Sequence, residues 1–332
     1  MENRKEFGLR MPSEGAFSAI ARNLHRTTSE MAVAAEKSFA HIKERAYLIS
    51  SQLRRELGCE RVLEAILTTD EAVRIYRRCL EKLDDAAWFD EINCRETDAF
   101  VRRNTRAETL LLCREIAKND DPVSPETLIS WLFGGISPAP EGRDRKVAFL
   151  RNRQASRAFE RFAKELGGVS AVYEDNFQNA CESVFSGQST YAIIPIHSMT
   201  DGRLNSFYRQ MEKYDLSIVM TCEIESDDGE NVTTFALIYR DRIYMPAEGD
   251  ILYECKITFD DLTSLADIAD AAAYFGVTIE SIEALPVLFS GRANAFAFVF
   301  GLKNADISGF FCYLALEYPQ ATAIGVYGKT CF

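Results

Sequence analysis

The chain has 332 residues, of which 47% are hydrophobic and 27% are charged, and its formal net charge at pH 7 is −12. A strongly acidic chain is repelled by phosphate backbones, so nucleic acid is a poor partner. No run approaches the ~20 consecutive apolar residues of a membrane-spanning helix, and the first residues lack the apolar core of a secretion signal, so no membrane association is expected. The length exceeds that of one typical core, which predicts two or three domains.

Cysteine and histidine usage indicates the compartment and the available chemistry. The 9 cysteines are scattered singly without a C-x-x-C pair. This pattern is typical of reduced thiols, and we expect a cytoplasmic protein. His25, His41 and His197 are far apart in sequence, which argues against a histidine-based metal site. We therefore expect neither a metal nor a cofactor.

Residues 1–140 predict an all-α domain, because apolar side chains recur at helical spacing and β-branched runs are nearly absent. The clearest helix extends over residues 28–57. Ser124 followed by Pro125 is a strong signal for the start of another helix, since serine caps well and proline fits the first helical position. A proline-containing linker follows this helix and ends the segment.

The pattern changes after Arg145. Short strands alternate with helices over residues 145–245, which is typical of βαβ units in an α/β domain with a mainly parallel sheet. Residues 251–332 follow the order β-α-β-β-α-β, which predicts a ferredoxin-like α+β domain. Such a domain has an open sheet edge or face, so we expect a homodimer or tetramer that forms through it.

Three stretches of the two C-terminal segments carry the motifs of a known family. The first is FQNACESVFSGQSTYAIIPIHSMTDGRLNSFYRQMEKYDLSIV, residues 177–219. It resembles the first lobe of prephenate dehydratase, which has a helix ending in S-G and a strand ending in V-P-I-E-N-S-T-x-G. ENVTTFALI, residues 230–238, is similar to the family's T-R-F strand. GVTIESIEALP, residues 276–286, is similar to a stretch of the ACT domain that follows the dehydratase. The resemblance covers residues 146–332 and implies one periplasmic-binding-like lobe followed by an ACT-type domain.

Two stretches of the helical segment carry a second similarity. They are FAHIKERAYLI, residues 39–49, and TRAETLLLCREIAKNDDPVSPETLISWLF, residues 105–133. Both resemble parts of an AroQ-type chorismate mutase domain. In bifunctional P-proteins a mutase domain of this type precedes the dehydratase. The resemblance therefore implies the P-protein order, with a mutase-like segment, then the dehydratase-like residues 145–245, then the ACT-like residues 251–332.

The dehydratase resemblance implies a set of site residues. In the family, the threonine of T-R-F helps to expel the ring hydroxyl as an acid, and the adjacent arginine holds a substrate carboxylate. Here Thr234 stands in the place of that arginine. The alternative is that the two threonines of this strand are ordinary β-branched strand residues. The implied residues are catalytic Thr233 and Thr200 and substrate-binding His197, Ser198 and Gly202.

One part of the family's structure has no counterpart in this chain. In the family a second lobe of several dozen residues lies between the strands that correspond to Ile218 and Asn231, where this chain has only a hairpin-length stretch. The dehydratase site lies in the cleft between the lobes, and one lobe cannot enclose a substrate or exclude water. The sequence therefore argues against dehydratase activity.

Two further pairs of residues follow from the resemblance. Leu265 and Glu283 match the effector site of the ACT domain, although the same domain could serve as a structural dimer module. Arg45 matches a mutase position where an arginine grips a substrate carboxylate. Arg106 belongs to the pair Thr105-Arg106, which stands in the place of the family's R-E pair, and it is the second catalytic candidate. Arg45 lies beside an apolar helix face, where a guanidinium needs an anion. A substrate carboxylate or one of three acidic side chains can supply it: Glu36, Glu64 or Glu96.

These observations leave two functional hypotheses. The first is a diverged P-protein-like protein linked to L-phenylalanine biosynthesis. It would bind a small anionic aromatic-pathway metabolite (chorismate, prephenate or phenylalanine) and retain mutase rather than dehydratase activity. The second is a non-catalytic regulatory or scaffolding protein that uses the ACT-like and dehydratase-like domains for association. The missing lobe and Thr234 favour the second hypothesis for dehydration, while the arginine-rich helices support the first.

Overall fold

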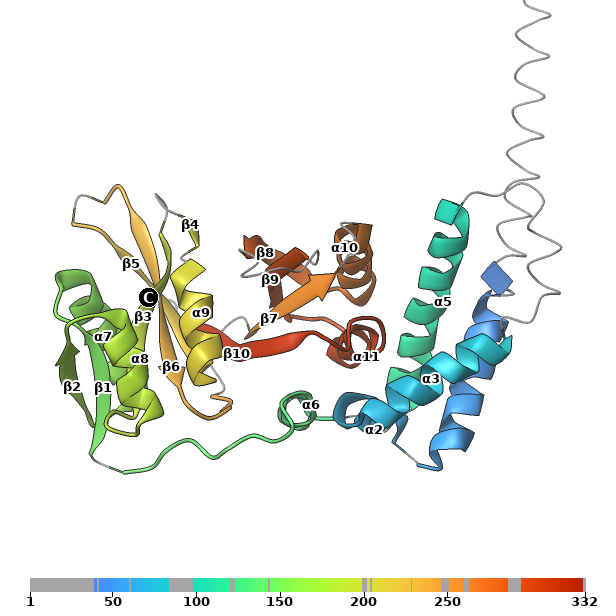
Figure 1. Cartoon of the computed structure of the whole chain (residues 1–332), viewed down its shortest axis with the longest axis horizontal. Coiled ribbons are helices and arrows are strands. Elements are labelled where there is room, and N and C mark those ends of the chain that lie inside the picture. The colour runs from blue at the N-terminus through green and yellow to red at the C-terminus, as the bar shows by residue number, and fades with distance from the viewer. Residues whose placement is uncertain are drawn as a thin grey trace, which may run out of the picture.

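The computed structural model describes residues 39–40, 42–59, 61–83, 98–119, 123–142, 144–198, 202–203, 205–227, 229–245, 251–259, 263–285 and 294–330. In Figure 1 the first helices lie at one end, the C-terminal strands and their helices lie in the middle, and the remaining strands lie at the other end. Within the described ranges, no helix combines the length and the apolar character needed to cross a bilayer.

The N-terminal part is helical over its described residues, as the sequence predicts. Ser124 caps its last helix by accepting a hydrogen bond from the Thr127 amide, and Pro125 occupies the first turn. Residues 28–38 of the predicted first helix lie outside the described residues. The described helices are residues 42–57, α2 (Val62–Thr68), α3 (Asp70–Leu83), α5 (Asp98–Asn119) and α6 (Pro125–Leu132).

Ten strands of the described part form one continuous sheet in the order β2-β1-β3-β6-β5-β10-β7-β9-β8, with β4 on the end of β3. Strand β10 pairs in parallel with β5 and antiparallel with β7, so it joins the two halves of the sheet. The strands are β1 (Arg145–Leu150), β2 (Val169–Glu174), β3 (Tyr191–Ser198), β4 (Gly202–Arg203), β5 (Ser217–Glu225), β6 (Val232–Tyr239), β7 (Ile251–Phe259), β8 (Thr278–Leu285), β9 (Asn294–Gly301) and β10 (Thr322–Thr330).

The half of the sheet formed by β1 to β6 is mixed, and the prediction of a mainly parallel sheet was wrong here. Strand β1 pairs in parallel with β2 and β3, but β6 is antiparallel to both β3 and β5. The short connection between β5 and β6 explains the difference, because a hairpin can only join antiparallel strands. In the other half, the predicted β-α-β-β-α-β order is observed, with α10 (Thr263–Phe275) and α11 (Ile307–Glu317) between the strands.

Helices cover both faces of the first half of the sheet. Helix α7 (Arg153–Leu166) begins at the capping residue Asn152 and packs on one face. Helices α8 (Phe177–Phe185) and α9 (Asn205–Tyr214) pack on the opposite face. The core beneath α9 also includes Ala295 and Ala297 of β9, so α9 lies against both halves of the sheet. A separate core lies between α10, α11 and the N-terminal helices.

Candidate functional site

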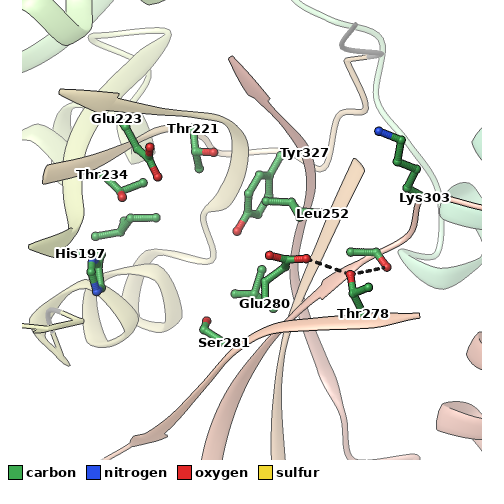
Figure 2. A pocket seen from close by; sticks show the side chains of 13 residues that line it. His197, Thr221, Glu223, Thr234, Leu252, Thr278, Glu280, Ser281, Lys303 and Tyr327 are labelled. Carbon is green, nitrogen blue, oxygen red and sulfur yellow. Dashed lines mark hydrogen bonds between the residues drawn. The ribbon is translucent and has the colours of Figure 1, made fainter. Parts of the chain in front are cut away.

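A cavity of about 530 Å³ lies on the α9 side of the sheet, where the two halves meet. This volume is in the range of small-molecule sites. Figure 2 shows side chains entering it from both halves of the sheet. The lining residues are Ile196, His197, Thr221, Glu223, Thr234, Leu252, Thr278, Glu280, Ser281, Val299, Gly301, Lys303 and Tyr327.

Alternation along β6 decides which of its two threonines reaches the cavity. Ala236 belongs to the core beneath α9, whereas Phe235 belongs to the core beneath α7. Successive strand residues point to opposite faces, so Thr234 shares the face of Ala236 and lines the cavity. Thr233 shares the face of Phe235 and points toward α7. The threonine that the resemblance assigns to catalysis therefore lies on the other face of the strand.

Two residues on neighbouring strands lie opposite Thr234. The register places His197 of β3 and Glu223 of β5 beside it, and all three line the cavity. Thr221 lies two positions before Glu223 and is buried in the same wall. These residues come from the ends of three adjacent strands, so one wall of the cavity is polar.

A β-bulge builds the opposite wall. The register of β8 against β9 shifts between Ile279 and Ser281, and the consecutive residues Glu280 and Ser281 both line the cavity. Thr278 Oγ1 donates a hydrogen bond of 2.9 Å to Glu280 Oε1 (Figure 2). A Cβ at Gly301 would clash with Thr278 Oγ1 and lie 2.9 Å from Glu280 Oε1. Glycine at this position leaves room for both side chains in this wall.

A fully buried carboxylate lies behind the cavity. Glu254 of β7 has no exposed surface. It accepts a hydrogen bond of 2.6 Å from the Tyr208 hydroxyl of α9 and one of 2.5 Å from the Tyr327 hydroxyl of β10. A buried charge is costly unless it is hydrogen-bonded, so these two tyrosines stabilise Glu254. The hydrogen bond between Tyr327 and Glu254 also fixes the position of Tyr327, which forms part of the cavity floor.

The charges of the cavity differ from those that a dicarboxylate site needs. Its described lining includes two carboxylates, Glu223 and Glu280, together with Lys303 and His197, and it includes no arginine. Bidentate recognition of a carboxylate depends on the planar fork of a guanidinium. The geometry therefore suits a ligand with a cationic or hydroxyl group better than a ligand with two carboxylates.

The residues predicted for the dehydratase site are only partly brought together. His197 lines the cavity. Ser198, the last residue of β3, lies opposite Gly202 of β4 and Thr233 of β6. Thr200 lies outside the described residues. Glu223, Glu280 and Glu254 were not among the residues predicted from the sequence, although an acidic residue within an otherwise apolar strand was a signal for Glu254.

Arg45 is buried in the helical part and pairs with a carboxylate of the chain. Its Nε atom donates to Glu108 Oε2 at 2.9 Å, and both side chains are about nine-tenths buried, with 10% and 8% exposed. The predicted need of Arg45 for an anion is met, but by a different acid from the three that the sequence suggested. Glu64 is on α2, and Glu36 and Glu96 lie outside the described residues. The observed partner comes from α5, 63 positions away.

Arg106 points away from Arg45. It forms ion pairs with Asp267 and Asp270 of α10. Arg106 and Glu108 are two positions apart on α5, and helix residues at this spacing do not share a face. The two predicted mutase arginines therefore lie on different sides of α5 and do not converge on one pocket.

The two predicted effector residues also lie apart. Leu265 packs against the core between α10, α11 and the N-terminal helices. Glu283 lies opposite Ala297 in the register of β8 and β9, and Ala297 belongs to the core beneath α9. Leu265 and Glu283 are therefore on opposite faces of this half of the sheet. Among the described residues, no three His, Cys, Asp or Glu side chains are grouped as metal ligands would be.

No protein-family model matches the chain, and no curated protein matches it. Solved structures with a similar fold include the prephenate dehydratase from Streptococcus mutans, with 16% identity and a TM-score of 0.46 over 56% of this chain and 100% of that chain. Another is the prephenate dehydratase from Arthrobacter aurescens in complex with L-Phe, with 14% identity and a TM-score of 0.45 over 55% and 89%. A third is GqqA, described as a novel type of quorum quenching acylase, with 18% identity and a TM-score of 0.47 over 56% and 96%. The likeness is one of fold and covers about half of this chain.

Proposed function

We propose that this chain is a diverged, dehydratase-like protein that binds a small molecule in the sheet cavity and acts as a regulatory protein rather than as an enzyme. The observation that carries this proposal is the position of Thr234. It lines the cavity at the place where the resemblance expects an arginine, and Glu223 lies opposite it in the register.

The chemistry of dehydration supports this choice. Loss of carbon dioxide and hydroxide from prephenate requires a proton donor and a clamp on the substrate carboxylate. A threonine hydroxyl carries no charge and cannot form the paired bonds of a guanidinium. The carboxylates of Glu223 and Glu280 repel a dicarboxylate that enters the same cavity.

The contacts of the helical part support the absence of mutase activity. Chorismate mutase catalysis requires arginines that converge on the two carboxylates of the substrate. Arg45 is held by Glu108, and Arg106 is held by Asp267 and Asp270. Both guanidinium groups thus neutralise carboxylates of the chain itself, which is a structural role.

The wider parts of the proposal follow from the motif resemblance. They are the division into a mutase-like segment (1–140), a dehydratase-like domain (145–245) and an ACT-like domain (251–332), and assembly of a homodimer or tetramer through the last of these. They also include a cytoplasmic location, as the scattered cysteines favour, and a connection with L-phenylalanine biosynthesis. The order β10-β7-β9-β8 of the C-terminal strands supports an ACT-type assignment.

Enzyme assays on the purified full chain test this proposal. Chorismate and prephenate are supplied separately, and their consumption is followed by absorbance and by chromatography of the products. We expect no turnover above the uncatalysed rate. Turnover of either compound by the wild-type chain above that rate would contradict the proposal and restore the enzymatic hypothesis. A thermal-shift screen of small metabolites tests the binding role, and a screen that finds no ligand for the cavity would count against it.

A further inference from the structure

We propose that the cavity binds a small organic amine, with its cationic group against Glu280 and Glu223 and its apolar part on Leu252, Val299 and the ring of Tyr327. This inference rests on the proposed binding role and names the class of ligand. Three features support it: the position of Glu280 in one wall of the cavity, the position of Glu223 in the other, and the apolar floor between them.

Glu280 is the first of the two carboxylates that the amine would contact. The bulge in β8 and the glycine at position 301 together place it in the cavity wall. The Thr278 hydroxyl orients it through a hydrogen bond of 2.9 Å. Among the residues that the structure describes, Glu280 forms no ion pair with a cationic side chain. An oriented carboxylate of this kind is a strong acceptor for an ammonium group.

Glu223 supplies negative charge from the other wall. It is half-buried on β5 and enters the cavity from the opposite side to Glu280 (Figure 2). Two carboxylates in one cavity lower the energy of a cation there and raise that of an anion. The other titratable groups of the lining are His197, on the Glu223 side, and Lys303, on the side of Thr278 and away from Glu223 (Figure 2). The two carboxylates therefore bring negative charge to the cavity from both walls.

The floor of the cavity suits the hydrocarbon part of the ligand. Val299 and Tyr327 are buried, with 5% and 2% of their surfaces exposed, and Leu252 is half-buried beside them. The hydrogen bond from Tyr327 to Glu254 holds the tyrosine ring in place. An apolar floor below charged walls excludes small inorganic cations, which need oxygen ligands on all sides, and favours an organic cation.

Calorimetric titration of the full chain with two matched probes tests this inference. Phenethylamine and 3-phenylpropionate have the same ring and chain, and they differ in the sign of the terminal charge. We expect phenethylamine to bind and 3-phenylpropionate not to bind under the same conditions. Glu280→Gln and Glu223→Gln should each weaken amine binding by about tenfold, the scale of a hydrogen bond to a charged group. Glu165→Gln, an exposed residue of α7 on the opposite face of the sheet, should leave it unchanged.

A second variant separates charge from space. Ser281→Trp keeps both carboxylates and fills the cavity from an edge strand, so it should abolish amine binding. Circular dichroism spectra establish that each variant is folded. Absence of phenethylamine binding to the wild-type chain, or binding that Glu280→Gln, Glu223→Gln and Ser281→Trp all leave unchanged, would overturn the inference. Binding of 3-phenylpropionate instead of the amine, with loss in Ser281→Trp, would overturn the amine assignment and leave the binding role intact.

Discussion

The hydroxyl of Tyr327 donates a hydrogen bond of 2.5 Å to Glu254, a carboxylate with no exposed surface. Tyr327 is on β10, the strand that joins the two halves of the sheet, and Glu254 is on the neighbouring β7. Tyr208 of α9 donates to the other oxygen of the same carboxylate. The cluster therefore ties the cavity floor, the joining strand and the covering helix together.

Removal of one donor from this cluster should destabilise the fold. Tyr327→Phe leaves one oxygen of a fully buried carboxylate without this donor, and we expect the free energy of unfolding to fall by ~1–3 kcal/mol. Urea denaturation measures the change. Tyr173→Phe removes a hydroxyl from an exposed position of β2 and serves as the control, with no change expected. Equal stability of the two variants would show that the hydrogen bond contributes nothing.

The pair of Arg45 and Glu108 gives a second stability prediction. Arg45→Ala removes one partner of a buried ion pair and leaves the Glu108 charge without this compensation. We expect a loss of ~3–5 kcal/mol. The double variant Arg45→Met with Glu108→Leu removes both charges and should recover most of that loss. If the stability loss of the double variant equals the sum of the losses of the two single variants, the two side chains do not interact.

A third prediction concerns the charge of the cavity. Thr234→Arg places a guanidinium beside Glu223 in the register and neutralises that carboxylate. We expect weaker binding of phenethylamine, by about tenfold, because one of two anionic partners is lost. Thr234→Gln has a similar reach without the charge and should change binding less. Calorimetry with the same probe measures both variants, and an identical effect of both would assign the change to size rather than charge.

Thiol chemistry gives a prediction for pH dependence. Burial raises the pKa of Cys181 and that of Cys222 to about 12. A thiol with a higher pKa in the folded state contributes stability that is fully present below the pKa of the unfolded thiol. This stability is lost as the pH rises from the unfolded pKa through the folded pKa. We therefore expect the free energy of unfolding to fall between about pH 8.5 and pH 12. Cys181→Ala with Cys222→Ala should flatten this decline, and urea denaturation across the range measures it.

The same burial predicts the order of thiol reactivity. Only the thiolate reacts with alkylating agents, so Cys181 and Cys222 should react slowly at pH 8 in the folded protein. Cys59 is half-buried and should react before them. Mass spectrometry of peptides after brief treatment with iodoacetamide measures the order. Modification of Cys222 before Cys59 would contradict the burial that the structure assigns.

Local features of the fold could be predicted from the sequence because they depend on neighbouring residues. Ser124 and Pro125 fix the start of α6, since a cap and a proline act within one turn. The alternation of helix and strand after Arg145 and the order β-α-β-β-α-β after Ile251 follow from the period of apolar residues. The need of Arg45 for an anion also followed from its place beside an apolar helix face.

Which acidic residues pair with Arg45 and Arg106 depended on tertiary contacts. The sequence did not indicate that Glu108, 63 positions from Arg45, supplies the anion, or that Asp267 and Asp270 hold Arg106. Periodicity shows which face of an element is buried, but it does not show which surface covers that face.

The sequence by itself determined the elements, their order and the absence of an arginine at position 234. Only the tertiary structure decided that β10 pairs with both β5 and β7, and that the cavity forms where this pairing joins the two halves. It also decided that Thr234 rather than Thr233 reaches the cavity, because the register of β6 sets the face of each residue. The physical reason is that strand pairing over long separations depends on the fit of whole surfaces, which no local pattern encodes.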